Sequence, residues 1–249
     1  MANNNIEKVT AYDIAQMIDH SLLRPDMTRQ EVAEQCEIAH EYECSTVCVK
    51  PCDVEVAQEI LKDSPCKVTS VIGFPHGSNL TEVKLLEARR AIEQGCEEID
   101  MVLNIDRLKS GDLDLVEADV KAVCDIAHSS NVKVKVIFEN FYLTDDEIVV
   151  ACKLCTNVGA DWVKTSSGYA GGGATVEDLT LMRANTPAHI QVKAAGGVRT
   201  LDGALTVRKI GCTRFGATAT IKIVEEARER EAAGTLVLPE VVEPLGKKY

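Results

Sequence analysis

Two lysines occupy equivalent places in a repeated strand-like pattern. Lys164 lies in "VKTSSG" at residues 163–168, and Lys193 lies in "VKAAGG" at residues 192–197. One strand–helix unit separates them, so we expect them at similar heights on neighbouring strands, roughly 5 Å apart at the backbone. Burial and mutual repulsion of the two ammonium groups both lower a lysine pKa, which favours a neutral, nucleophilic Lys164. The alternative is that each lysine forms a buried ion pair with a carboxylate.

Other polar residues are predicted to point at the same interior. Asp100 lies on the strand-like segment before that of Lys135, and it could neutralise the lysines, act as a general acid–base through a water, or both. Asp19 is interpreted as polar support, and Cys48 as lining of the cavity. The five histidines show neither HxH nor HExxH spacing, so the sequence predicts chemistry without a metal.

Two glycine-containing segments suggest an anion site. "AGGVRT" at residues 195–200 and "FGATAT" at residues 215–220 each follow or end a strand-like segment. At such positions, backbone N–H groups and a helix N-terminus can bind a phosphate. The run "GYAGGG" at residues 168–173 either helps to form that site or is a mobile loop.

These residues need a framework, and the apolar periodicity supplies one. Strand-like segments alternate with helical patterns along the chain, and glycines at 95, 159 and 211 lie where helices should end. The expected strands are MIDHSLL, STVCVK, VTSVIGF, EEIDMVL, VKVKVIFE, DWVKTSS, IQVKAAG and TRFGATA. The sequence therefore predicts an α/β fold, a (β/α)₈ TIM barrel. The competing open sheet should carry a GxGxxG turn after its first strand, and the sequence has none there.

The predicted barrel forms a single domain over residues 1–249. Its core spans about residues 12–230, after an N-terminal helix, and a flexible C-terminal tail covers about 231–249. Alternate strand residues point to opposite faces, and the side facing the helices must be apolar. The polar side therefore points inward along at least four consecutive strands, which indicates a site inside the barrel.

Composition excludes several classes of partner. The net charge is −12, which argues against nucleic-acid or anionic-membrane binding, and no apolar run reaches the length of a membrane span. The first residues do not resemble an export signal, so a cytoplasmic location is expected. The ten cysteines are then expected to be reduced, including Cys152 and Cys155, whose spacing alone would allow a redox or metal pair.

Taken together, the motifs resemble the deoxyribose-phosphate aldolase family. The similarity runs from about residue 18 to residue 220 and includes IDHSLLRPD, VCVKP, VIGFPHG, EEIDMVLN, KVIFE, VKTSSG, GGGATVEDLTLMR, VKAAGGVRT and RFGAT. The resemblance implies a class I aldolase that interconverts 2-deoxyribose 5-phosphate with acetaldehyde and glyceraldehyde 3-phosphate through a lysine Schiff base. The alternatives are a related Schiff-base aldolase for another short sugar or sugar phosphate, and a non-catalytic phosphate-binding barrel.

The resemblance also implies roles for individual residues. Lys164 would form the Schiff base, Lys193 would depress its pKa, and Asp100 would relay protons. The phosphate would be held by Gly168, Gly196, Gly197, Gly216, Thr218 and Ala219. No metal or organic cofactor is implied, the partners are small aldehydes and sugar phosphates, and the assembly would be a homodimer or homotetramer.

Three positions depart from the family pattern. Ser167 stands in place of a threonine in the lysine motif, and Asn140 stands in place of another threonine after the fifth strand. The family's last strand commonly ends in two serines, whereas here Thr218 keeps a hydroxyl and Ala219 lacks one. These changes bear on the substrate more than on the chemistry.

The tail VVEPLGKKY ends at Tyr249, and some members of the family end in a tyrosine that assists proton transfer at the enamine carbon. The other interpretation is a flexible end without a catalytic role, which Pro239, Pro244 and Gly246 favour. If the tail acts, deletion of Tyr249 slows turnover and the exchange of acetaldehyde methyl protons with solvent deuterium, while borohydride trapping at Lys164 is kept. Unchanged exchange in the truncated enzyme assigns the tail to the second interpretation.

Overall fold

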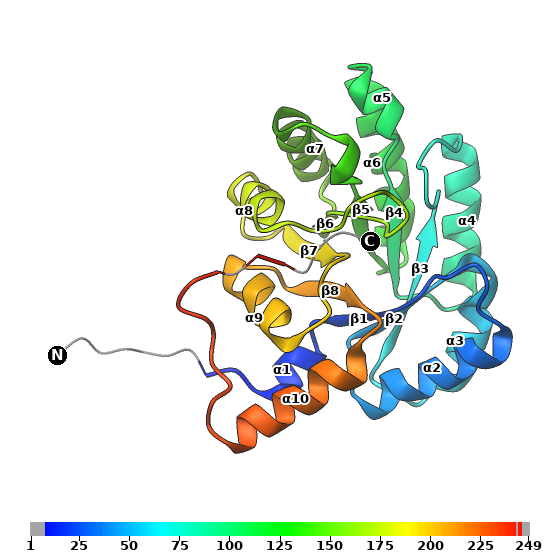
Figure 1. The fold of residues 1–249 in the computed structure, drawn as a ribbon. Coiled ribbons are helices and arrows are strands. Elements are labelled where there is room, and N and C mark those ends of the chain that lie inside the picture. Colours follow the sequence, from blue (N-terminus) through cyan, green and yellow to red (C-terminus); the bar gives the residue numbers. More distant parts are fainter. Residues whose placement is uncertain (1–7, 243, 246–249) are drawn as a thin grey trace.

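Eight parallel strands close into a barrel that helices surround (Figure 1). The computed structural model describes residues 8–242, 244 and 245. Each strand pairs with the next one along the chain, and β8 pairs with β1. The predicted (β/α)₈ architecture is thereby confirmed.

The strands lie close to the predicted segments. They are β1 (Ile18–Leu22), β2 (Thr46–Val49), β3 (Lys67–Ile72), β4 (Glu98–Val102), β5 (Lys133–Ile137), β6 (Trp162–Lys164), β7 (Gln191–Ala195) and β8 (Arg214–Ala217). The helices are α1 (Ala11–Ala15), α2 (Arg29–Glu41), α3 (Val54–Leu61), α4 (Thr81–Glu93), α5 (Ile105–Lys109), α6 (Leu113–Ser129), α7 (Asp145–Val158), α8 (Val176–Ala184), α9 (Leu201–Ile210) and α10 (Thr220–Ala232). Two 3₁₀ turns, η1 (Pro51–Asp53) and η2 (Asn140–Tyr142), follow β2 and β5.

Local sequence signals fix the helix ends. The Thr28 hydroxyl accepts a hydrogen bond from the Glu31 amide at the start of α2, and the Glu31 carboxylate accepts one from the Thr28 amide in return. At the other end, Gly159 and Gly211 close α7 and α9 in the left-handed conformation that glycine adopts most readily. The ends of the helices set where each following strand begins.

Strand β4 shows how the two faces of the barrel differ. Ile99 and Met101 are fully buried in the apolar layer between the strands and the helices. Glu98 and Asp100 alternate with them and contact charged side chains inside the barrel. The inward direction predicted for the polar residues is confirmed.

The first described residues and the segment just after α10 meet on one side of the barrel. Helix α1 lies beside α10 (Figure 1). Beyond α10, Leu236 is buried and Val237 forms an isolated antiparallel bridge with Lys8. Tyr249 lies outside the described residues. In the part of the chain that the structure describes, no helix combines the length and apolar character needed to cross a membrane.

A buried ion pair connects two outer helices to the end of β4. Lys84 of α4 donates to Asp119 of α6 at 2.5 Å and to the carbonyl oxygen of Val102 at 3.0 Å. Thr81 donates to the other oxygen of Asp119 at 2.8 Å. Gly73 leaves room for the lysine, because a Cβ there would lie 2.9 Å from Lys84 Cε. Val102 follows Asp100 by two residues, so this pair supports the strand that carries the interior carboxylate.

The pair is predicted to matter for stability. Asp119→Leu should lower the free energy of unfolding by about 3–5 kcal/mol, because it leaves the Lys84 ammonium buried without a counter-charge. The double variant Lys84→Met/Asp119→Leu should lose much less, since no charge remains buried there. Urea unfolding measures both values. Equal losses in the single and double variants would show that the pair contributes through packing alone.

Candidate active site

A cavity opens at the carboxyl ends of the strands, the face on which barrel enzymes build their active sites. It is lined by Asp19, Ser21, Leu23, Cys48, Lys164, Ser167, Lys193, Ala195, Gly196, Gly197, Val198, Arg199, Gly216, Ala217 and Thr218. Most of the sequence-predicted site residues therefore meet in one place. Asp100, Lys135, Gly168 and Ala219 are not among the lining residues.

Lys164 and Lys193 are direct neighbours across β6 and β7, in the predicted register. Both ammonium nitrogens approach the same oxygen of Asp100, Lys164 at 2.6 Å and Lys193 at 2.8 Å. Lys193 also contacts Asp19. All four side chains are at most 4% exposed. The lysines thus form buried ion pairs, as the alternative interpretation expected, and they are close enough to influence each other.

The environment separates the two lysines electrostatically. Burial lowers the pKa of Lys164, and although Asp100 raises it, repulsion from Lys193 adds to the lowering. Burial also acts against a charge on Lys193, but Asp100 and Asp19 outweigh it and hold the pKa of Lys193 above its usual value. Lys164 is therefore the amine that can be neutral beside a permanent cation.

Asp100 is held as a carboxylate. Burial alone would raise its pKa, but Lys135, Lys164 and Lys193 together keep that pKa well below its usual range. Its other oxygen accepts a hydrogen bond from Lys135 at 2.9 Å, across the register pair of β4 and β5. Asp100 is therefore ionised and can accept hydrogen bonds, but so low a pKa makes it a weak base while all three lysines are charged.

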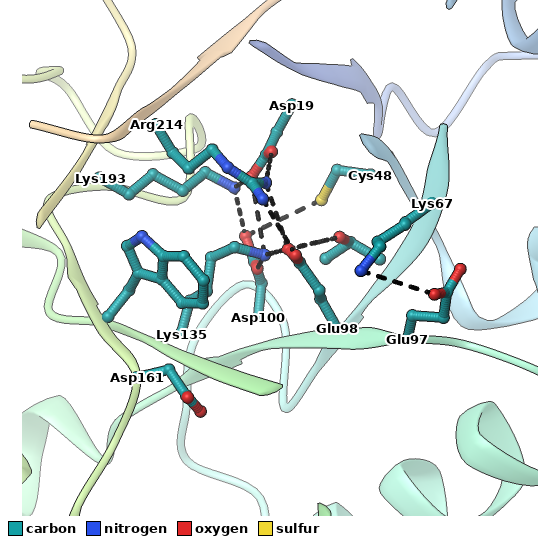
Figure 2. A network of polar contacts seen from close by, with 12 residues as sticks. Asp19, Cys48, Lys67, Glu97, Glu98, Asp100, Lys135, Asp161, Lys193 and Arg214 are labelled. Carbon is teal, nitrogen blue, oxygen red and sulfur yellow. Dashed lines mark hydrogen bonds and ion pairs between the residues drawn. The ribbon is translucent and has the colours of Figure 1, made fainter. Parts of the chain in front are cut away.

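A layer of charged side chains lies below the cavity. Two of its members, Glu98 and Arg214, had no role predicted from the sequence. Figure 2 shows Arg214 between Asp19 and Glu98, at 2.7 Å and 3.2 Å, and Lys135 between Glu98 and Asp100. Strand parity places both side chains inside the barrel. That parity was the available signal, but it does not reveal which charges pair.

Cys48 lies at the cavity wall beside Asp100. Its Sγ is 3.9 Å from an Asp100 oxygen, and it packs with Leu23 and Val71 in a small apolar cluster. Burial, with the Asp100 charge, raises the pKa of Cys48 to about 11. A thiol at neutral pH is a poor nucleophile, so the position of Cys48 agrees with a lining role.

The far end of the cavity is formed by the loops after β7 and β8. Gly196 and Gly197 line it with positive φ angles of 75° and 90°, which only glycine adopts without strain. Arg199, which lies two residues after Gly197 in the segment AGGVRT and had no predicted role, also lines this end. Helices α9 and α10 begin just beyond these loops, and Ala219 is the N-cap of α10.

The glycine-rich loop after β6 supports the cavity from behind. A Cβ on Gly173 would lie 2.7 Å from the carbonyl carbon of Gly196, so the two loop backbones pack directly against each other. Ser167 lines the cavity, donates its hydroxyl hydrogen to Glu139 and accepts a hydrogen bond from the Tyr169 amide. Within residues 8–242 and 244–245, no group of three acidic, histidine or cysteine side chains is arranged to hold a metal ion.

A buried lysine pair in the cavity of a (β/α)₈ barrel is an arrangement that a Schiff-base aldolase could use. The sequence model of the DeoC/LacD family aldolases matches residues 14–247, and the chain belongs to this family. It is 48% identical to the deoxyribose-phosphate aldolase of Thermococcus gammatolerans over 221 residues, which cover 88% of this chain and 98% of the relative. The enzyme of the same name from Caldanaerobacter subterraneus is 47% identical over 219 residues, covering 88% and 95% of the two chains.

Solved structures give the same result. The chain is similar to the tetrameric deoxyribose phosphate aldolase of Aeropyrum pernix, with a TM-score of 0.81, 29% identity, and coverage of 87% of this chain and 92% of that one. A structure described as QR15, an aldolase, has a TM-score of 0.84 at 36% identity and covers 89% of this chain and 98% of its own.

The geometry predicts distinct outcomes for the two lysines. Lys164→Arg should abolish turnover and borohydride labelling, because a guanidinium stays protonated. Lys193→Leu removes the neighbouring cation, so the Lys164 pKa should rise and the rising limb of kcat/KM against pH should move to higher pH. Rate profiles and mass-spectrometric mapping of the trapped adduct measure both effects. An adduct mapped to Lys193 would reverse the assignment.

Proposed function

We propose that this protein cleaves 2-deoxy-D-ribose 5-phosphate reversibly to acetaldehyde and D-glyceraldehyde 3-phosphate, with Lys164 as the Schiff-base residue. The observation that carries the proposal is a buried lysine with a lowered pKa, beside a cationic lysine, in the cavity of a DeoC/LacD family barrel. The relatives named deoxyribose-phosphate aldolase match nearly their whole length, which supports the same reaction for this chain.

The chemistry follows from the positions of three groups. The neutral Nζ of Lys164 attacks the aldehyde carbon C1 of the open-chain sugar, and loss of water gives an iminium. Asp100, through a water, accepts the proton of the C3 hydroxyl as the C2–C3 bond breaks and its electron pair moves toward the iminium nitrogen. The released product is glyceraldehyde 3-phosphate. The enamine left on Lys164 takes a proton at C2, and hydrolysis frees acetaldehyde and the lysine.

The cation Lys193 is proposed to act through its charge. Before substrate binds, its charge favours the neutral form of Lys164. Asp19 and Asp100 anchor its ammonium, so it stays within reach of the reacting atoms at a fixed position. Asp19 and Lys135 are then proposed to hold the charged side chains in place. Cys48 and Ser167 are proposed to line the end of the cavity at which Lys164 meets the aldehyde.

The phosphate is proposed to bind at the opposite end, near Gly196, Gly197, Gly216 and Thr218. Arg199 lines the same end and supplies a positive charge, and the N-termini of α9 and α10 favour an anion there. Ala219 has no hydroxyl to offer at the start of α10, which favours a weaker preference for the phosphate ester than a serine would give. A related aldolase for another short sugar or sugar phosphate is the second candidate on that ground.

We also propose that the protein forms a homo-oligomer and is located in the cytoplasm. The tetramer of the Aeropyrum pernix enzyme makes a homodimer or homotetramer the expected assembly. A cytoplasmic location stays a prediction from the sequence. The domain boundaries proposed above, with one barrel over the whole chain, agree with a family match that spans residues 14–247.

A substrate panel tests the function. Release of acetaldehyde from 2-deoxyribose 5-phosphate, faster than from free deoxyribose, is expected.

Ala219→Ser should lower KM for the phosphate ester with little change for free deoxyribose, since one hydrogen bond to a charged group contributes roughly 1.5–3 kcal/mol. Preferential turnover of a different sugar phosphate favours the second candidate. Absence of both turnover and borohydride trapping at Lys164 would leave a non-catalytic barrel, and equal effects of Ala219→Ser on both substrates would exclude this turn as the phosphate site.

A further inference from the structure

Seven ionisable side chains form one connected network inside the barrel. Its members are the carboxylates of Asp19, Glu98 and Asp100 and the basic groups of Lys135, Lys164, Lys193 and Arg214. Arg214 is the most exposed of them, with 13% of its side chain accessible, and the others are at most 4% exposed. If all seven were ionised, the network would carry one uncompensated positive charge, which is costly in so dry an interior.

The contacts determine which basic group can most easily lose its proton. Lys135 lies against all three carboxylates, Glu98 at 2.5 Å, Asp100 at 2.9 Å and Asp19 at 3.6 Å. Arg214 pairs with Asp19 and Glu98, and its guanidinium stays protonated in proteins. Among the residues that the structure describes, Lys164 has Asp100 as its one ion-pair partner, and it shares that oxygen with Lys193. Lys164 is the least compensated cation of the network.

We infer that Arg214 and Glu98, which lie beneath the cavity and do not line it, are positioning residues that set the charge balance of this network and so tune the protonation of Lys164, Arg214 favouring the neutral amine and Glu98 opposing it. Arg214 occupies one oxygen of Asp19, while Lys193 contacts the other. Glu98 binds both Arg214 and Lys135, and it thereby joins β8 to β5 across the barrel (Figure 2). The inference rests on the proposed function only in taking Lys164 as the nucleophile.

Other groups face the network from the neighbouring strands and loops. Cys48 on β2 stays a neutral thiol because burial raises its pKa. Glu139, two residues beyond β5, is buried and bonded to Ser167; burial raises its pKa, and the charge of Lys164 acts against that rise, so Glu139 is a further acidic group that acts on Lys164 from outside the seven. On β3, Thr69 contacts Glu98 and Lys135 through an uncharged hydroxyl. The ring of Trp162 on β6 lies 5.4 Å from the Arg214 guanidinium and 5.6 Å from Lys135 Nζ, which stabilises both cations.

The balance predicts opposite effects for two neutralising substitutions. Arg214→Gln removes the excess positive charge, so Lys164 holds its proton more strongly and the rising limb of kcat/KM moves to higher pH. Glu98→Gln adds to the excess, so the limb moves to lower pH. A unit charge at roughly 10 Å, with an effective dielectric constant of about 20, shifts a pKa by about one unit, and we expect limb shifts of that size. The measurement is the pH profile of kcat/KM for 2-deoxyribose 5-phosphate.

Two matched controls separate charge from packing. Arg214→Lys keeps the charge and should leave the limb in place, and Arg214→Gln/Glu98→Gln restores the balance and should return it close to that of the parent. The inference is overturned if the two single variants shift the rising limb of kcat/KM in the same direction. It is also overturned if the limb of the double variant is shifted as far as that of either single variant. If Arg214→Gln does not fold, Glu98→Gln and the double variant still decide it. If the parent enzyme is not trapped by borohydride at Lys164, the proposed function itself is refuted. If the parent is trapped but the two single variants do not shift the limb in opposite directions, only the charge balance is refuted.

Discussion

The Asp100 carboxylate holds the interior of this barrel together. It accepts contacts from ammonium groups on three successive strands, Lys135 on β5, Lys164 on β6 and Lys193 on β7. Without it, these cations would repel one another in a site from which water is largely excluded. Their attraction in turn is what allows a carboxylate to remain ionised there. The proposed nucleophile Lys164 and the stability of the interior therefore depend on the same carboxylate.

This arrangement explains why a charged interior is compatible with a stable fold. The apolar core is not inside the barrel but between the strands and the helices, where residues such as Ile99 and Met101 are fully buried. The interior charges need only compensate one another. Because one basic group exceeds the carboxylates, the compensation is incomplete, and the deficit falls on Lys164 at the cavity surface. The least compensated cation of the interior is thus the proposed nucleophile.

The two ends of the cavity are built by different means. Side chains fixed on strands carry the charged end, where a small displacement would change the pKa of the lysines. The opposite end is made mainly of loop backbone, with Gly196 and Gly197 at positive φ and Gly173 packed directly behind. Loop backbone can approach an anion closely, and the start of a helix adds a favourable field. In this fold, strands are expected to position the side chains that react, and the loops after them are expected to bind the substrate.

The sequence by itself determined the alternation of strands and helices, the inward direction of the polar residues and the register of Lys164 with Lys193, because these follow from local periodicity and regular strand spacing. It did not determine which of the two lysines loses its proton. That depends on Asp19 reaching Lys193 from β1, and on Glu98 and Arg214 meeting across the barrel from β4 and β8. Such partners are far apart in the sequence, and only closure of the barrel brings them within ion-pair distance.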